Sequence, residues 1–149
     1  MADDNNTLTA AQRDDLRALA GVIIPASDEY RVPGADDDKI QDDMLKTLGR
    51  DARDVREALT MLAKLAEGSF AALDATQRMR TALRLRGTGA PCVATLTRVV
   101  MQCYYRDDRV VRSLGLEARP PFPKGHVLEG GDWSLLDPVR ERELGWRKV

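Results

Sequence analysis

The sequence predicts an all-α protein, a small bundle of five or six helices followed by an extended, proline-rich C-terminal arm. Composition favours helices over strands, because Ala, Leu and Arg are abundant while aromatic residues make up only 5%. Apolar residues recur at helical spacing in successive segments that are separated by Gly and Pro. The length of 149 residues and the hydrophobic content of 43% fit one globular domain with a real core.

The first helix is expected to begin after Thr9 and to end before Pro25. Thr9 and Gln12 have the spacing of a capping box, which opens helices. Pro25 stops the helix because the residue before a proline is disfavoured in the α region. Residues 1–8 are polar and are predicted to be a flexible N-terminus, so that residues 9–115 form the bundle domain.

Three further helices are marked by similar start and stop signals. Asp residues at 36–38 stand where a helix N-terminus favours negative charge, before a second helix. In the fourth helix we expect Met79, Ala82 and Leu83 to form the apolar side, with arginines distributed around the rest. The second helix is expected to end at Gly49. The third has an apolar stripe that begins at Val55, and it ends at Gly68. Asp74 and Gln77 open the fourth helix, and Gly87 marks its end.

The segment 92–105 is the most apolar stretch of the sequence and is expected to be the central, most buried helix. Pro91 suits the first position of that helix. A further short helix should follow Asp107 or Asp108, either of which can act as its N-cap, and should end at Gly115. These elements complete the predicted bundle.

No catalytic residue, cofactor-binding residue or metal ligand is expected in this chain, because nucleophile-elbow, dinucleotide, P-loop and zinc motifs are all absent from the sequence. Cys92 and Cys103, eleven residues apart in one predicted helix, are too distant to pair and are expected to be buried. The acidic residues at 36–43 lack EF-hand spacing, which favours helix capping. His126, the single histidine, is interpreted as exposed or interface-packed, with a donor role at a partner's active site as the alternative.

Charge and hydropathy limit the classes of partner. The net charge of −1 gives no strong attraction to nucleic acid, and no stretch approaches the ~18 apolar residues of a membrane span. The arginines of the fourth helix face several directions, which is typical of a solvated face. No export signal is visible at the N-terminus, which predicts a cytoplasmic protein; periplasmic transport by a partner is the alternative.

Residues 116–149 form the predicted C-terminal arm, which holds four of the seven prolines and both tryptophans. One short helix is expected there, from Pro138 to Leu144. Large aromatic side chains favour burial against an apolar surface, so the arm either folds back on its own bundle or wraps a partner. The side chains concerned are those of Phe122, Trp133 and Trp146.

Two separated motifs carry a family resemblance. The first reads Gly-Val-Ile-Ile-Pro-Ala at 21–26 and Val-Pro-Gly-Ala-Asp at 32–36, and the second reads Cys-Tyr-Tyr-Arg-Asp-Asp-Arg-Val at 103–110. In this order and spacing the sequence resembles the gluconate 2-dehydrogenase subunit 3 family over about residues 10–126. These are small subunits of FAD-dependent dehydrogenases whose large subunit belongs to the glucose-methanol-choline oxidoreductase group. The matched positions are Ile24, Pro25, Pro33, Gly34, Ala35, Tyr104, Tyr105 and Asp107, with Cys103 at a place that is often glycine.

The resemblance implies a non-catalytic small subunit that binds a large flavoprotein dehydrogenase subunit and supports its folding, flavin loading or stability. FAD would be held by the partner and no cofactor by this chain; a cytochrome c subunit is a further partner in some complexes of this kind. Many relatives carry a twin-Arg export signal, which this sequence lacks. The residues expected to bind the partner are Tyr104, Tyr105, Phe122, His126, Trp133 and Trp146.

Two interpretations from other classes stay open. A stand-alone helical adaptor or regulatory protein would have the same bundle and arm. An independent small enzyme would need a site built from Asp, Tyr and Arg side chains with perturbed titration.

Overall fold

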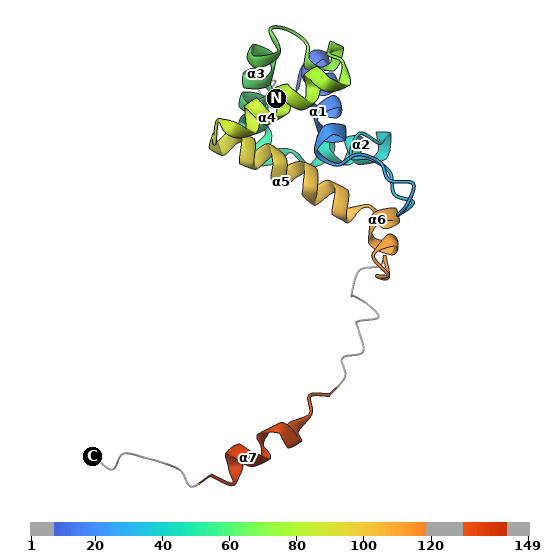
Figure 1. Ribbon diagram of the computed structural model, residues 1–149, viewed down its shortest axis with the longest axis vertical. Coiled ribbons are helices and arrows are strands. Elements are labelled where there is room, and N and C mark those ends of the chain that lie inside the picture. The colour runs from blue at the N-terminus through green and yellow to red at the C-terminus, as the bar shows by residue number, and fades with distance from the viewer. Residues whose placement is uncertain (1–7, 119–129, 143–149) are drawn as a thin grey trace, which may run out of the picture. The chain divides into compact units, whose positions relative to one another are not determined.

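The computed structural model describes residues 8–118 and 130–142 of the chain, and within these ranges it has seven α-helices and no strand beyond one isolated β-bridge (Figure 1). The prediction of an all-α protein is confirmed. The chain divides into two compact units, residues 1–118 and residues 119–149. The proline-rich stretch of the predicted arm, 119–129, and its end, 143–149, lie outside the described residues.

The first unit contains six of the helices, and their starts follow the predicted capping signals. The Thr9 hydroxyl accepts from Gln12 N at 3.2 Å while Thr9 N donates to the Gln12 side chain at 3.0 Å. Asp74 and Gln77 form the same reciprocal pair at the start of the fourth helix. The helices are α1 Ala10–Ile23, α2 Asp38–Thr47, α3 Ala52–Ala66, α4 Ala75–Gly87, α5 Pro91–Arg106 and α6 Asp108–Ser113.

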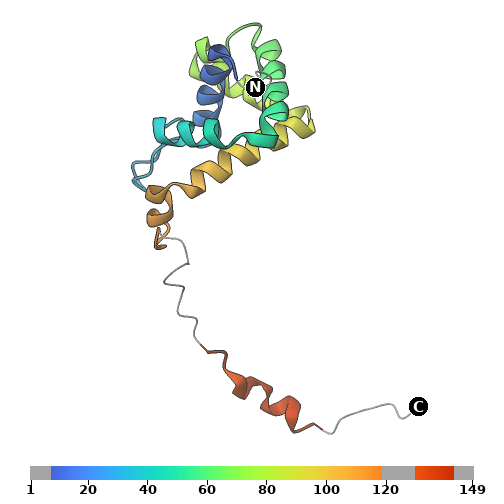
Figure 2. The same cartoon turned by 180° about the vertical axis from the view of Figure 1, so that it is seen from behind.

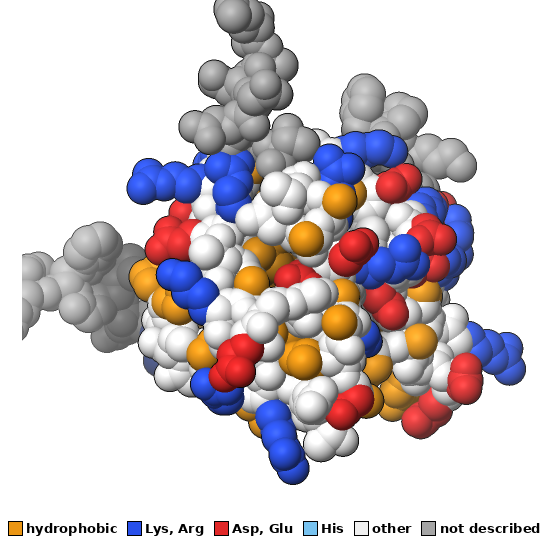
Figure 3. Space-filling model, turned by 90° about the horizontal axis from the view of Figure 1, so that it is seen from above, with side chains coloured by type: hydrophobic (Ala, Val, Ile, Leu, Met, Phe, Trp, Pro, Cys, Tyr) orange, Lys and Arg blue, Asp and Glu red, His pale blue; other side chains and the backbone are white. Residues whose placement is uncertain are grey.

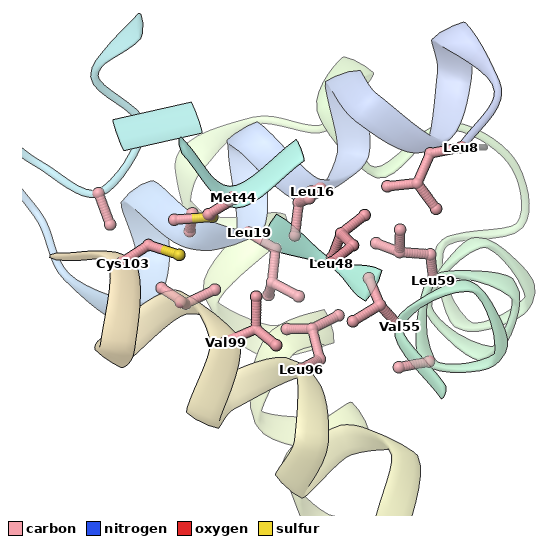
Figure 4. Packing of buried hydrophobic residues seen from close by; sticks show 14 of the residues in the cluster. Leu8, Leu16, Leu19, Met44, Leu48, Val55, Leu59, Leu96, Val99 and Cys103 are labelled. Atoms are coloured by element: carbon pink, nitrogen blue, oxygen red, sulfur yellow. The ribbon is translucent and has the colours of Figure 1, made fainter. Parts of the chain in front are cut away.

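Helix α5, the predicted central helix, has six buried residues, more than any other helix in the described ranges, but it does not lie at the centre of the first unit. It runs along one side of the bundle, and α1, α2 and α3 all lie on the same side of α5 (Figures 1 and 2). Leu96 and Val99 of α5 point toward Leu19 of α1 and Val55 of α3 (Figure 4). All four side chains are buried, so the core is aliphatic and lies between α5 and the layer formed by α1 and α3.

The core extends one residue further toward the N-terminus than the sequence suggests. Leu8, predicted as part of the flexible segment, is only 3% exposed and packs in the core near Leu59 (Figure 4). It directly precedes the N-cap Thr9, the position where an apolar residue commonly fixes the entry of the chain into a helix. Arg13 Nε donates to the Leu8 carbonyl at 3.1 Å, which helps to fix the backbone where the chain enters α1.

Helix α4 packs on a different side from the predicted one. Thr81 and Leu85 are its buried residues, whereas Met79 is 49% and Leu83 56% exposed. Ala82 is half-buried between these two sides. The expectation that Met79, Ala82 and Leu83 form the core-facing side is therefore wrong for Met79 and Leu83, because the i, i+4 pair of Thr81 and Leu85 faces the neighbouring helices instead.

Both cysteines lie in α5, as predicted, and both are free and buried. Cys92 lies beside Met61 of α3, with 3.6 Å between the two sulfurs. Cys103 faces Thr47 at the end of α2, with 3.5 Å between Sγ and Oγ1. The two thiols thus act as small packing residues at opposite ends of one helix.

The described part of the second unit contains a 3-10 helix, Trp133–Leu136, followed by the short helix α7, Asp137–Arg140. The predicted helix from Pro138 to Leu144 is shorter than expected, since Glu141 and Arg142 form a turn and Leu144 lies outside the described residues. The Asp132 carboxylate caps this segment by accepting from Ser134 N at 3.1 Å. No helix in the two described ranges is both long and apolar enough to cross a membrane.

Candidate functional site

The starts of two helices meet at the guanidinium of Arg109, which belongs to the second motif of the family resemblance; one of the two contacts, Asp37, directly follows the first motif. Asp37 is the N-cap of α2 and Asp107 is the N-cap of α6, 70 positions later in the chain. Arg109 donates to Asp37 through Nη2 at 2.7 Å and Nη1 at 3.1 Å, and to Asp107 through Nε at 2.9 Å and Nη2 at 3.1 Å. One arginine therefore holds both helix starts together with two bidentate pairs.

The charges of this cluster are balanced to keep both carboxylates ionised. Hydrogen bonds from Arg109 hold the pKa of Asp37 and the pKa of Asp107 below the usual aspartate value. The pKa of Arg109 is raised in turn by the same hydrogen bonds, first from Asp107 and then from Asp37. Lys39 adds a second cation 3.8 Å from Asp107. Because the carboxylate oxygens are occupied by donors, the cluster is suited to fastening the fold rather than to proton transfer.

A second polar cluster lies between α2 and the end of α5. Arg106 donates to Asp43 Oδ2 through Nη2 at 2.6 Å and Nε at 3.0 Å, and to Thr47 Oγ1 at 3.2 Å. Cys103 lies 3.5 Å from the Arg106 Nη2, beside a surface hollow of about 350 Å³. Burial raises the pKa of the Cys103 thiol, which keeps it protonated and weakly nucleophilic at neutral pH.

The first motif folds into a tight loop between α1 and α2. Ala35 N donates to the Ile24 carbonyl at 2.9 Å, and Ser27 pairs with Val32 across an antiparallel bridge. A Cβ placed on Gly34 would lie 2.9 Å from Ala26 N and would collide with the Asp36 carboxylate. The loop therefore has no room for a side chain at position 34, which explains the glycine of this motif physically.

The predicted partner-binding residues are placed very differently by the structure. Tyr104 is only 5% exposed and lies in the core, where burial raises its pKa. Tyr105 is 52% exposed, and its ring meets that of Tyr104 edge to face at a centroid distance of 5.3 Å. Tyr104 therefore packs inside the bundle while Tyr105 alone of the pair presents most of its ring to the surface.

The remaining predicted residues belong to the second unit. Trp133 is 69% exposed, at the start of the 3-10 helix. Its neighbours Leu135, Leu136 and Val139 are also exposed. The other three predicted residues, Phe122, His126 and Trp146, lie outside the described residues.

The first unit also has an uncovered apolar surface that the sequence does not reveal. A hollow of about 440 Å³ lies between α1, α4 and α5, and we call it the α4 groove. Met79 and Leu83 stand at its edge as large exposed side chains, on the side of α4 that was expected to face the core. The groove is lined by Leu19, Val22, Ile23, Met79, Ala82, Leu83, Leu85, Arg86, Val93, Leu96 and Thr97.

Elsewhere the surface of the bundle is mixed in character. On the face shown in Figure 3, hydrophobic side chains form small patches between arginines, lysines and carboxylates. Within the described ranges no group of three or more His, Cys, Asp or Glu side chains is arranged to hold a metal ion. Large exposed apolar side chains thus occur at the α4 groove of the first unit and around Trp133 in the second unit.

Comparison with known proteins adds no relative to this picture: no protein-family model, curated protein or solved structure matches the chain.

Proposed function

We propose that this chain is a non-catalytic small subunit that binds the large subunit of an FAD-dependent sugar or alcohol dehydrogenase and supports its folding, flavin loading or stability. The observation that carries the proposal is the large apolar side chains left uncovered in both units. Met79 and Leu83 lie exposed at the α4 groove, and Trp133 and Leu135 lie exposed in the second unit. Groups of exposed large apolar side chains are typical of protein interaction sites.

The family resemblance supplies the class of partner. Its matched positions include Gly34, whose place in a tight loop leaves no room for a side chain, and Asp107, which caps α6. Both residues therefore have structural roles in the bundle, which supports an architectural role for the two motifs. In this proposal FAD belongs to the large subunit, a cytochrome c subunit is a further partner of the complex, and the small subunit works in the cytoplasm or is carried to the periplasm by its partner.

Co-expression tests the proposal. The full chain, tagged, would be produced together with any flavoprotein of the glucose-methanol-choline type encoded next to it and passed over a size-exclusion column with detection at flavin wavelengths. We expect one peak that contains both chains and flavin, and we expect no stoichiometric flavin from the small subunit produced alone.

Two results would contradict the proposal. A chain that elutes as a folded monomer beside an independently active, flavin-loaded flavoprotein would favour the stand-alone adaptor. A stoichiometric flavin spectrum, or dehydrogenase turnover, from this chain alone would make it an enzyme in its own right.

A further inference from the structure

The α4 groove continues into two neighbouring hollows and is therefore elongated. It shares Val22 and Met79 with a hollow of about 680 Å³ beside α1. It shares Arg86, Val93 and Thr97 with a hollow of about 550 Å³ along α5. An elongated, open depression of this kind is better suited to a peptide segment than to a compact small molecule, which favours an enclosed cleft.

The residues on two walls of the groove are spaced one helical turn apart. Met79 and Leu83 are one turn apart on α4, and Val93 and Thr97 are one turn apart on α5. Side chains in i, i+4 rows leave a furrow between them into which the apolar side of another helix can pack. Methionine adapts its shape to such a partner because its side chain is flexible and polarizable.

One arginine of α4, Arg86, lines the groove. Helix α4 carries four arginines, at positions 78, 80, 84 and 86, and no acidic residue. Arg78 donates to the Ala71 carbonyl and Arg84 to the Leu65 carbonyl. Arg80 lines a different hollow, together with Leu65 and Glu67. Within the part of the chain that the structure describes, Arg86 has no carboxylate within ion-pair distance. Arg86 also lines the groove itself, so a bound segment with acidic residues would meet an unpaired cation there.

We propose that the α4 groove binds an acidic amphipathic helix of the large subunit, whose apolar side packs against Met79 and Leu83 while a carboxylate of the helix pairs with Arg86. This inference rests on the proposed function and names the surface and the chemistry of the contact. A protein helix is favoured over an anionic membrane because the surface is concave. Asp14 and Asp36 line the neighbouring hollow beside α1, so the acidic residues of the bound helix are expected at the opposite, Arg86 end of the groove.

The test uses the full chain and the purified flavoprotein, with the dissociation constant measured by titration at low and at high salt. Leu83→Asp places a charge in the apolar part of the groove and should raise the dissociation constant at least about tenfold at both salt concentrations. Arg86→Glu should raise it about tenfold at low salt and distinctly less at high salt, where charge interactions are screened. Both positions are exposed, so the fold should be retained, which circular dichroism and thermal unfolding check.

Tyr30→Asp is the matched control. Tyr30 is a large side chain with 66% exposure, similar to Leu83, and it lies in the loop after α1 outside the groove. The same change from a large side chain to aspartate should there leave the affinity within about twofold. The control separates a specific contact at the groove from a general effect of a new surface charge.

The outcomes distinguish this inference from the function on which it rests. If the unaltered chain does not bind the flavoprotein at all, the proposed function fails. If the chain binds and Leu83→Asp binds equally well, only the groove inference is overturned. It is also overturned if Leu83→Asp instead abolishes binding to vesicles of phosphatidylcholine and phosphatidylglycerol, or dissociates a homodimer, while the flavoprotein contact is unchanged.

Discussion

The guanidinium of Arg109 donates to the carboxylate of Asp37 at 2.7 Å, although the two residues lie 72 positions apart in the sequence. Asp37 is the N-cap of α2. Arg109 also donates a hydrogen bond to Asp107, the N-cap of α6. The side chain of Asp107 is 3% exposed while that of Arg109 is 40% exposed. A mostly buried carboxylate therefore has a partly solvated arginine as its main ionic partner, with Lys39 as a second cation at 3.8 Å.

Replacing Arg109 by methionine should destabilise the bundle by about 1–3 kcal/mol, because it leaves the buried Asp107 carboxylate without its main partner. Urea unfolding followed by circular dichroism measures the change. Arg112→Met is the control, since Arg112 forms only an exposed i, i+4 pair with Asp108 at 3.4 Å and should cost about 0.5 kcal/mol or less. Equal losses for the two variants would show that the Arg109 contacts do not stabilise the fold.

Stability should also fall at acidic pH through the same cluster. Arg109 holds the pKa of Asp37 and of Asp107 below the usual value, so near the unfolded aspartate pKa of about 3.9 the folded chain binds fewer protons than the unfolded chain. The stabilisation is complete above about pH 4 and is lost as pH falls through the lowered pKa of each folded-state carboxyl.

Urea unfolding at a series of pH values between neutral and about pH 3 checks this expectation. Asp107→Asn keeps a capping side chain but cannot titrate, so its free energy of unfolding should fall less steeply with acid than that of the unaltered chain. Parallel curves for the two proteins would mean that Asp107 has the same pKa in both states.

Gly34→Ala should destabilise the chain by about 1–3 kcal/mol, because the new Cβ would press on the backbone nitrogen of Ala26 and on Asp36 in the loop between α1 and α2. The backbone contact cannot be relieved by moving a side chain alone. Gly87→Ala is the control: its Cβ would meet nothing within 4 Å, and alanine is the better helix residue at the end of α4. The prediction is contradicted if the two variants unfold at the same urea concentration.

Local sequence signals predict the helices well, because each signal depends on only a few neighbouring residues. The capping box of Thr9 and Gln12 forms at the predicted position. Of the two predicted candidates for the N-cap of α6, Asp107 and Asp108, the structure has Asp107. The many buried residues of α5 follow from its apolar sequence. These features depend on spacing within about one turn, which a sequence shows directly.

The contacts between distant segments could not be predicted in this way. Helix α4 carries two overlapping apolar patterns, and only the fold decides that Thr81 and Leu85 turn inward while Met79 and Leu83 turn outward. The α4 groove therefore has no signature in the sequence. The Arg109 cluster could have been suspected, because Arg109 lies within the second motif, yet its pairing with Asp37 depends on the tertiary fold.

The thiol of Cys103 should react slowly in the folded protein. Burial raises its pKa and removes it from solvent, so both the thiolate fraction and the access of a reagent are low. Labelling with a disulfide reagent at neutral pH should be at least about tenfold slower in the native chain than in urea. Cys92→Ala isolates Cys103 for this measurement, and rapid labelling of that variant while it remains folded would contradict the burial.

The last prediction concerns the predicted arm, residues 116–149. Trp133 and Leu135 are exposed in its described part, and burying one large aromatic side chain is worth about 2–3 kcal/mol, so an interface with the large subunit would gain much from covering them. We therefore expect that a chain ending at residue 115 keeps the helical circular dichroism of the bundle but no longer co-purifies with the flavoprotein. Trp133→Ala in the full chain should weaken binding about tenfold or more if Trp133 is an anchor of that contact. Unchanged affinity of the truncated chain would mean that the arm does not contribute to the contact, leaving the bundle surface to hold the partner by itself.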